Sequence, residues 1–207
     1  MTIAIIGTGR MGRGLARRLA SAGETVTLCG RDDLKAAAAA AALGPGIVSG
    51  PTSEAANAEI VILAIPYHET ANALRAAGDL AGKIVIDITN PVGPELSLAI
   101  GMTTSAAEEV QKLVPKARVV KAFNTLFAEL LDLQLSEDDT PPQVIYAGDD
   151  RAAKERVAEL IAAIGFEPLD GGPLKNARFL EPIGLMTIQF GHALGRGTRI
   201  SPRFVEY

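Results

Sequence analysis

Three glycines near the amino end follow the spacing Gly-x-Gly-x-x-Gly, from Gly7 through Gly9 to Gly12. An apolar run at 3–6 precedes them and apolar residues at helical spacing follow over 10–22, so the motif joins a buried strand to a helix. In this setting Gly7 permits the tight turn, Gly9 lets a phosphate approach the backbone, and Gly12 lets the helix pack against the strand. The helix amides and dipole stabilise phosphate charge. The pattern predicts a dinucleotide site, with an unliganded glycine-rich turn as the alternative.

The end of the second predicted strand, over 25–29, indicates which dinucleotide binds. NAD sites usually place Asp or Glu there to bond the ribose 2′-hydroxyl, about 20 residues beyond the glycines. This chain has Gly30 and Arg31 instead, and a guanidinium binds a 2′-phosphate through paired hydrogen bonds. Asp32 and Asp33 come one or two residues later and suit a helix cap better than a ribose contact. The sequence therefore favours NADP(H) over NAD(H).

Two more segments lie where predicted strands end. Ala64-Ile65-Pro66-Tyr67-His68 closes the strand expected over 59–65, and Thr89-Asn90-Pro91-Val92 closes the one over 83–88. Ligands of open parallel sheets bind at the carboxyl ends of strands, where Asn90 would bond the ribose or the nicotinamide amide. An ordinary Asn-Pro turn is the alternative. His68 is either a cofactor contact or a solvated residue at a helix start, and we do not interpret it as a catalytic base.

Strands and helices alternate over the first two thirds of the chain. Further strands are expected at 47–48 and 118–122, and helices at 34–43, 69–77 and 105–114, the first of these rich in alanine. Alternation of this kind implies right-handed crossovers and a parallel sheet. The fold class expected is α/β, a Rossmann-type doubly wound and mainly parallel sheet.

The pattern changes in the last third of the chain. A polar stretch at 136–142 precedes a strand at 143–147, a helix at 151–164, a strand at 167–169 and a helical pattern over about 173–194. We expect a dinucleotide-binding domain over 1–135 and a small C-terminal α/β addition over 136–207. Apolar residues occur nearly all round the last helix, so a dimer partner is expected to cover part of it.

Composition excludes several classes of function. The 207 residues carry a net charge of −4 without basic runs, which argues against a nucleic-acid partner. No apolar run approaches the roughly 20 residues of a membrane span, and no signal pattern precedes the first strand. Cys29 is the only cysteine, so no intrachain disulfide forms. These features predict a cytoplasmic protein without a membrane partner, and the sequence offers no metal-ligand cluster and no catalytic triad.

Three segments carry a resemblance to a known family: Ile65-Pro66, the run from Val119 to Asn124, and the run from Pro168 to Arg178. With the glycine motif, they make the chain similar over essentially its whole length to the NADP oxidoreductases dependent on the deazaflavin coenzyme F-420. It also resembles the NADPH domain of the six-transmembrane metalloreductases. The resemblance implies a Rossmann domain and a small C-terminal domain, a homodimer, and hydride transfer between NADPH and a deazaflavin or flavin in the cleft between the domains.

The resemblance also implies roles for individual residues. The pyrophosphate would be lined by Thr8, Arg10 and Met11, and the 2′-phosphate by Arg31 and Lys35 beside Gly30. The nicotinamide side would be framed by Ile65, Pro66, Asn90 and Pro91, with Ala122 and Asn124 at the end of the next strand. Deazaflavin-using members have a histidine where this chain has Asn124, and the metalloreductase domains are more similar here. The acceptor therefore stays open between coenzyme F-420 and FMN or FAD.

Hydride transfer between two rings needs no protein nucleophile, so no catalytic side chain is assigned. One alternative is a carbonyl or imine reductase related to the β-hydroxyacid dehydrogenases or pyrroline-carboxylate reductases, with Lys121 or Lys175 as the candidate proton donor. Another is a module that binds NADPH without turnover.

Overall fold

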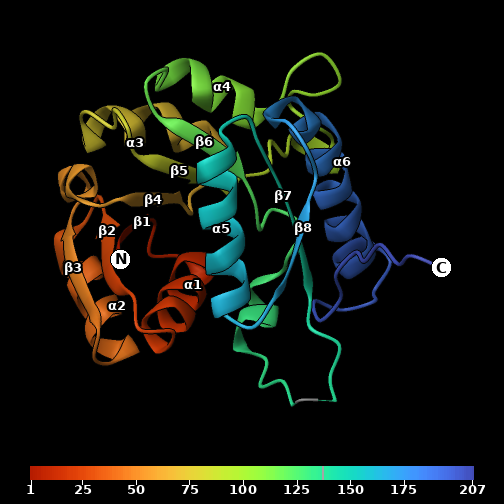
Figure 1. Ribbon diagram of the computed structural model, residues 1–207, viewed down its shortest axis with the longest axis horizontal. Coiled ribbons are helices and arrows are strands. Elements are labelled where there is room, and N and C mark those ends of the chain that lie inside the picture. The colour runs from red at the N-terminus through yellow and green to blue at the C-terminus, as the bar shows by residue number, and fades with distance from the viewer. Residues whose placement is uncertain (137) are drawn as a thin grey trace.

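The computed structural model describes residues 1–136 and 138–207. Its strands form one eight-stranded sheet in the order β3-β2-β1-β4-β5-β6-β7-β8 (Figure 1). The strands are β1 (Thr2–Ile6), β2 (Thr25–Gly30), β3 (Ile47–Pro51), β4 (Ile60–Leu63), β5 (Ile84–Asp87), β6 (Arg118–Lys121), β7 (Gln143–Gly148) and β8 (Glu167–Asp170). The first six are parallel to one another, which confirms the predicted Rossmann-type sheet.

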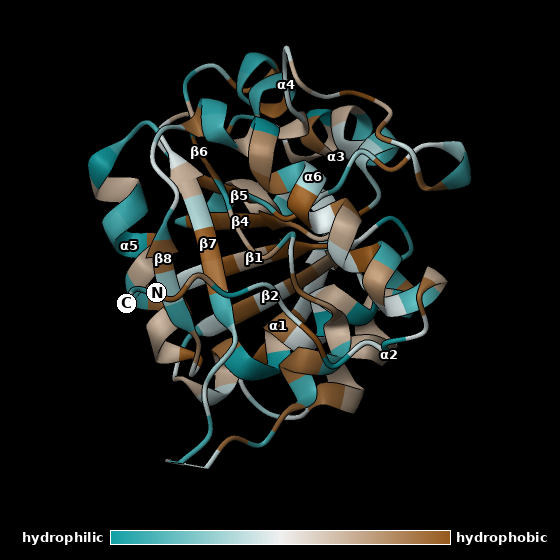
Figure 2. Cartoon of the chain, turned by 90° about the vertical axis from the view of Figure 1, so that its right-hand side faces the viewer, coloured by the Kyte–Doolittle hydropathy of each residue, from teal (hydrophilic) through white to brown (hydrophobic). Residues whose placement is uncertain are grey.

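Helices cover both faces of this sheet. They are α1 (Arg10–Ser21), α2 (Asp33–Leu43), α3 (Thr70–Ala77), α4 (Ala106–Leu113), α5 (Arg151–Ala163) and α6 (Ala177–Ile188). One apolar cluster joins Ile5 and Ile62 of the sheet to Leu15 of α1 and Leu160 of α5. Cluster members from α3 and α4 pack on the opposite face. The central strands are buried on both faces for this reason, and they form the apolar centre visible in Figure 2.

Local sequence explains how the helix after β2 begins and why it packs closely. The Asp32 side chain accepts a hydrogen bond from the backbone amide of Lys35 at 3.0 Å and so caps α2, as predicted. Ala36, Ala39 and Ala40 of the alanine run are buried against the sheet. Small side chains on this face let α2 approach the strands.

The last two strands extend the sheet with reversed direction. β7 pairs antiparallel to β6 through Val120 and Gly148, and β8 pairs parallel to β7. In Figure 1, α5 and α6 lie on opposite sides of these two strands. Leu180 of α6 packs on Ile145 of β7 in a small apolar cluster. The division of the chain into domains at 135 and 136 stays a prediction.

None of the helices in the described part of the chain combines the length and apolar content needed to cross a membrane.

Candidate functional site

The glycine turn between β1 and α1 has a geometry that only glycine permits. Gly7 has a φ of 126°, and a Cβ there would lie 2.1 Å from the Ala64 carbonyl oxygen. A Cβ on Gly12 would lie 2.0 Å from the Gly7 carbonyl oxygen. At Gly9, in contrast, no atom lies within 4 Å of the position a Cβ would take, and α1 begins without a side-chain cap or an acidic first turn. The turn therefore presents open space and uncapped helix amides to an anion.

A first cavity of about 290 Å³ lies beside this turn, at the carboxyl ends of β1, β2 and β4. Seven of the residues predicted to bind a cofactor line it: Gly7, Thr8, Gly9, Gly30, Arg31, Ile65 and Pro66. Ile6 and Ala64 of the strand ends also line it, together with five residues that sequence reasoning did not identify: Thr52, Glu69, Asn72, Ala73 and Ala76. These five come from the segment directly after β3, from the turn before α3 and from α3 itself, and their position depends on the tertiary fold.

Of the three basic residues predicted to contact the cofactor here, only one lines the cavity. Arg31 lines it, and Arg31 Nη1 lies 3.1 Å from both carboxylate oxygens of Glu69. Lys35 does not line it and pairs with Asp32 instead, at 3.3 Å. His68 is also outside the lining, with its exposed side chain 3.9 Å from Glu69. The structure therefore brings Arg31 to the groove but leaves Lys35 and His68 outside it.

A second cavity of about 490 Å³ continues from the first, sharing Gly9, Ala64, Ile65 and Pro66 with it. The predicted residues Arg10, Met11, Asn90 and Asn124 line this part of the groove. Its opposite wall comes from the segment after β6 and from the C-terminal helix and tail: Phe127, Gly184, Thr187, Ile188, His192 and Thr198. Gly12, Pro91 and Ala122 line neither cavity. Pro91 and Ala122 are buried, whereas Gly12 serves the packing of α1.

Asn90 and Asn124 form a reciprocal pair at the floor of the second cavity. Asn90 Nδ2 donates to the Asn124 carbonyl oxygen at 2.7 Å, and Asn124 Nδ2 donates to Asn90 Oδ1 at 3.0 Å and to the Leu180 carbonyl oxygen at 2.8 Å. Phe123, just before Asn124, has a φ of 60°, which turns the chain sharply after β6. Gly184 of α6 approaches so closely that a Cβ there would lie 2.6 Å from Asn90 Oδ1.

Three buried polar atoms on residues that line this cavity have no hydrogen-bond partner in the described structure. They are Thr89 Oγ1, Asn124 Oδ1 and Thr125 Oγ1, on side chains that are at most 5% exposed and that line the cavity. Buried polar groups are nearly always paired, so unpaired ones need an explanation. A carboxamide has one carbonyl oxygen that accepts hydrogen bonds and two N–H groups that donate them. It could therefore accept from the two threonine hydroxyls and donate to the Asn124 side-chain oxygen.

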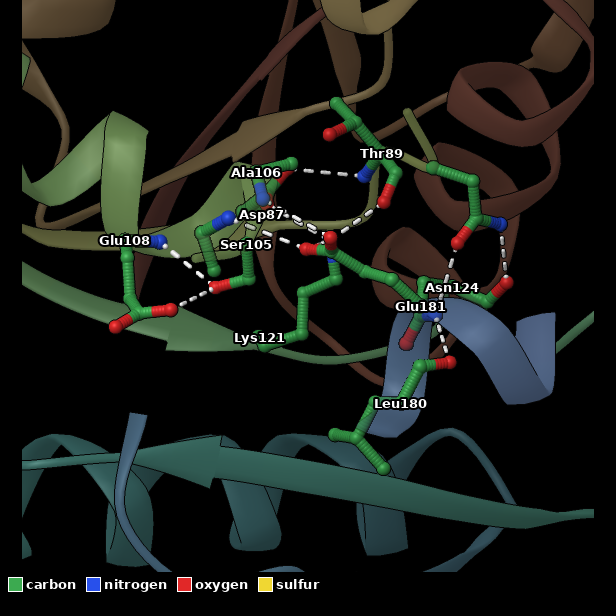
Figure 3. Close-up of polar contacts among 11 residues, drawn as sticks. Asp87, Thr89, Ser105, Ala106, Glu108, Lys121, Asn124, Leu180 and Glu181 are labelled. Carbon is green, nitrogen blue, oxygen red and sulfur yellow. Dashed lines mark hydrogen bonds and ion pairs between the residues drawn. The ribbon is translucent and has the colours of Figure 1, made fainter. Parts of the chain in front are cut away.

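A buried charge cluster lies beneath the site (Figure 3). Lys121 Nζ lies 2.9 Å from Asp87 Oδ2 and 2.9 Å from Glu181 Oε1, and it donates to the Thr89 carbonyl oxygen at 2.5 Å. The Glu181 carboxylate also accepts hydrogen bonds from the backbone amides of Ala106 and Ala107, the first two residues of α4. Burial raises the pKa of the Glu181 carboxyl. This cluster ties β5, β6, α4 and α6 together under the second cavity.

The two lysines considered as proton donors do not reach the groove. Lys121 is fully buried in the charge cluster, and Lys175 is exposed at the start of the C-terminal helical segment. Neither lines the second cavity. Neither of these two lysines is therefore placed to donate a proton in the carbonyl or imine reductase alternative. The described residues also include no group of three or more His, Cys, Asp and Glu side chains that could hold a metal ion.

His192 is a site residue that sequence reasoning missed, since its position near a helix end is explained equally well by the helix dipole. The helix ends in a π-helical turn, η6 (Gln189–Ala193), that directs His192 toward the groove. Its ring meets Phe127 edge-on, with 5.4 Å between centroids and an interplanar angle of 87°. A π-turn of this kind has no local sequence signal.

Comparisons with known proteins show the family and the fold. A family model described as "NADP oxidoreductase coenzyme F420-dependent" matches residues 2–91. The F420-dependent NADP reductase of Methanothermobacter thermautotrophicus is 36% identical over 201 residues, covering 88% of this chain and 86% of that protein. Metalloreductase STEAP3 of Rattus norvegicus is 35% identical over 185 residues, and the match covers 88% of this chain but only 36% of that longer protein.

Among solved structures, a candidate F420-dependent NADP reductase from Arthrobacter sp. FB24 superposes with a TM-score of 0.85 at 32% identity. The match covers 99% of both chains, so the C-terminal strands and helices are shared as well as the nucleotide-binding part.

Proposed function

The chain belongs to the NADP oxidoreductase, coenzyme F420-dependent, family, and we propose that it transfers a hydride between NADPH and a deazaflavin or flavin acceptor. The observation that carries this proposal is the continuous groove along the carboxyl ends of the parallel strands. One end of the groove contains Arg31, and the other is closed by α6 and η6. A dinucleotide lying along that edge would place its two halves in the two cavities.

The residues of the groove fit NADP(H). Open space at Gly9 and the uncapped start of α1 suit a pyrophosphate, and Arg31 suits a 2′-phosphate. Asn124 Oδ1 would accept from the nicotinamide carboxamide, and the hydroxyls of Thr89 and Thr125 would donate to its carbonyl oxygen. Together these contacts would select which face of the ring is turned to the acceptor. Bound NADPH supplies the hydride from nicotinamide C4.

The acceptor would lie between that ring and the opposite wall of the second cavity. Phe127 and Ile188 give this wall an apolar surface that limits access of water, and His192 is held at its edge by Phe127. Gly184, having no side chain, lets α6 pack closely on Asn90 and Asn124 at this wall. A planar tricyclic ring suits a wall of this kind. Orientation by the wall, with hydride passing from ring to ring, requires no acid or base from the protein.

Two observations bear on which ring is accepted. The Methanothermobacter relative is an F420-dependent reductase by name, which favours the deazaflavin. Asn124 stands where deazaflavin-using members have a histidine, which favours a flavin. Its side-chain amide donates hydrogen bonds to Asn90 Oδ1 and to the Leu180 carbonyl oxygen. We therefore propose a deazaflavin as the first candidate acceptor and FMN or FAD as the second.

The test is oxidation of NADPH by the purified protein, with coenzyme F-420, FMN, FAD and a panel of carbonyls and imines offered separately. We expect turnover with F-420 or a flavin and none with the panel. Turnover only with an imine or carbonyl would replace this proposal with a small-molecule reductase. Tight NADPH binding without turnover on any acceptor would replace it with a binding module.

A further inference from the structure

An ion pair spans the first cavity of the groove. Arg31 follows β2 and Glu69 directly precedes α3, and Arg31 Nη1 lies 3.1 Å from each carboxylate oxygen of Glu69. The Arg31 side chain is 83% exposed, whereas that of Glu69 is only 25% exposed. The carboxylate is therefore the more firmly placed partner. The guanidinium assigned to the 2′-phosphate thus shares its cavity with a fixed negative charge.

Glu69 is positioned by the backbone around it. Its amide donates to the Pro66 carbonyl oxygen at 3.0 Å within the short turn η2 (Tyr67–Glu69), and its side chain stands at the amino end of α3. A carboxylate is favourable at that end of a helix. His68 Nε2 lies 3.9 Å from Glu69 Oε1 on the exposed side. The backbone contacts fix the Cα of Glu69 beside the cavity, so its carboxylate stays within reach of a ligand that Arg31 binds.

We propose that Glu69 is a specificity-determining residue that sets the ratio of NADPH to NADH affinity; this inference rests on the proposed function. A phosphate bound by Arg31 would stand close to the Glu69 carboxylate, and the two negative charges repel each other. The exposed Arg31–Glu69 pair is weak, so Arg31 turns to a phosphate at little cost and the repulsion from Glu69 remains. Glu69 therefore lowers the affinity for NADPH.

The same carboxylate favours NADH. In NAD sites an Asp or Glu accepts a hydrogen bond from the ribose 2′-hydroxyl, normally from the end of the second strand. That strand ends here at Gly30, which carries no acceptor side chain, but Glu69 faces the same cavity from the segment after β4. Glu69 thus replaces the missing carboxylate from a different element of the fold, and the site keeps measurable affinity for NADH.

The test is the dissociation constant of each dinucleotide for the wild type and three variants. Glu69→Gln removes the charge and keeps the size, and we expect NADPH to bind about three- to tenfold more tightly and NADH more weakly. Arg31→Ala should weaken NADPH much more than NADH. Glu155→Gln is the matched control, since Glu155 accepts a hydrogen bond from exposed Arg151 on α5, outside the groove. It should leave both constants unchanged.

Three results would overturn the proposal. An unchanged NADPH-to-NADH ratio in Glu69→Gln, with Arg31→Ala still weakening NADPH, would remove the role of Glu69 but keep the 2′-phosphate assignment. Equal weakening of both dinucleotides in Glu69→Gln would indicate a merely structural role. If Arg31→Ala has equal effects on both, the proposed binding mode itself fails. High salt screens the repulsion between the phosphate and Glu69, so the gain in NADPH affinity in Glu69→Gln should be smaller at high salt. A structural effect would not depend on salt in this way.

Discussion

Lys121 Nζ lies 2.9 Å from Glu181 Oε1 in the protein core, so β6 and α6 are joined by an ion pair that solvent does not reach. Asp87 of β5 is the second carboxylate on the same ammonium group. Because α6 carries Gly184 and Thr187 in the wall of the second cavity, the cluster holds that wall against the sheet.

Lys121→Met should lower the free energy of unfolding by about 3–5 kcal/mol, because it leaves two buried carboxylates without a counter-charge. Glu181→Gln should cost less, since burial already raises the pKa of this carboxyl and the amide oxygen can still accept from the start of α4. Urea denaturation measures both values. Lys175→Met is the control and should change stability by no more than about 0.5 kcal/mol. A loss below about 1 kcal/mol in Lys121→Met would contradict the importance of the cluster.

The glycine motif gives a matched pair of variants. Gly9→Ala places its methyl group in open space, so the protein should fold normally while losing NADPH affinity by tenfold or more, because the methyl blocks the pyrophosphate. Gly7→Ala forces a Cβ to 2.1 Å from the Ala64 carbonyl oxygen at a φ of 126°, so it should disrupt folding. Thermal unfolding and NADPH titration separate the two effects. Undiminished NADPH binding by Gly9→Ala would contradict the pyrophosphate assignment.

Cys29 should be unreactive in the native protein. It is fully buried, and burial raises the pKa of its thiol to about 11, so roughly one thiol in a thousand is ionised at pH 8. Alkylation by iodoacetamide, followed by mass spectrometry, should proceed only in denaturant. Rapid labelling without denaturant would show that β2 opens at its end.

The Glu108–Arg178 pair between α4 and α6 should make stability depend on acid pH. Hydrogen bonds from Arg178, at 2.7 and 2.9 Å, lower the pKa of the Glu108 carboxyl below its ordinary value of 4.5. Its contribution is therefore complete above pH 4.5 and is lost as pH falls through the lower value of the folded state. The difference in unfolding free energy between wild type and Arg178→Gln should shrink over that range. A difference that stays constant with pH would exclude this linkage.

Large apolar side chains remain exposed on the C-terminal helical segment, among them Phe179, Met186 and Leu194. We propose that a second copy of the chain covers them, which would give a particle of about twice 21.6 kDa in light scattering. Met186→Glu should then shift the mass toward the monomer. A monomeric wild type at micromolar concentration would reject the dimer.

Local patterns were sufficient for most of the fold. The glycine spacing marked the β1–α1 turn, apolar runs marked the parallel strands, and Asp32 was identified as a helix cap. These features depend on residues near one another in the chain, so periodicity and turn chemistry predict them. The site residues predicted at strand ends, such as Arg31 and Asn90, line the groove for the same reason.

The sequence by itself thus determined the sheet, the nucleotide-binding edge and the resemblance to an NADP oxidoreductase family. Only the tertiary structure decided which charges meet: Lys35 turns to Asp32, Glu69 faces Arg31, and Lys121 is buried between Asp87 and Glu181. It also turned His192 into the second cavity through a π-helical end to α6. These outcomes depend on long-range packing and on the balance of desolvation against ion pairing, and neither has a local signature in the chain.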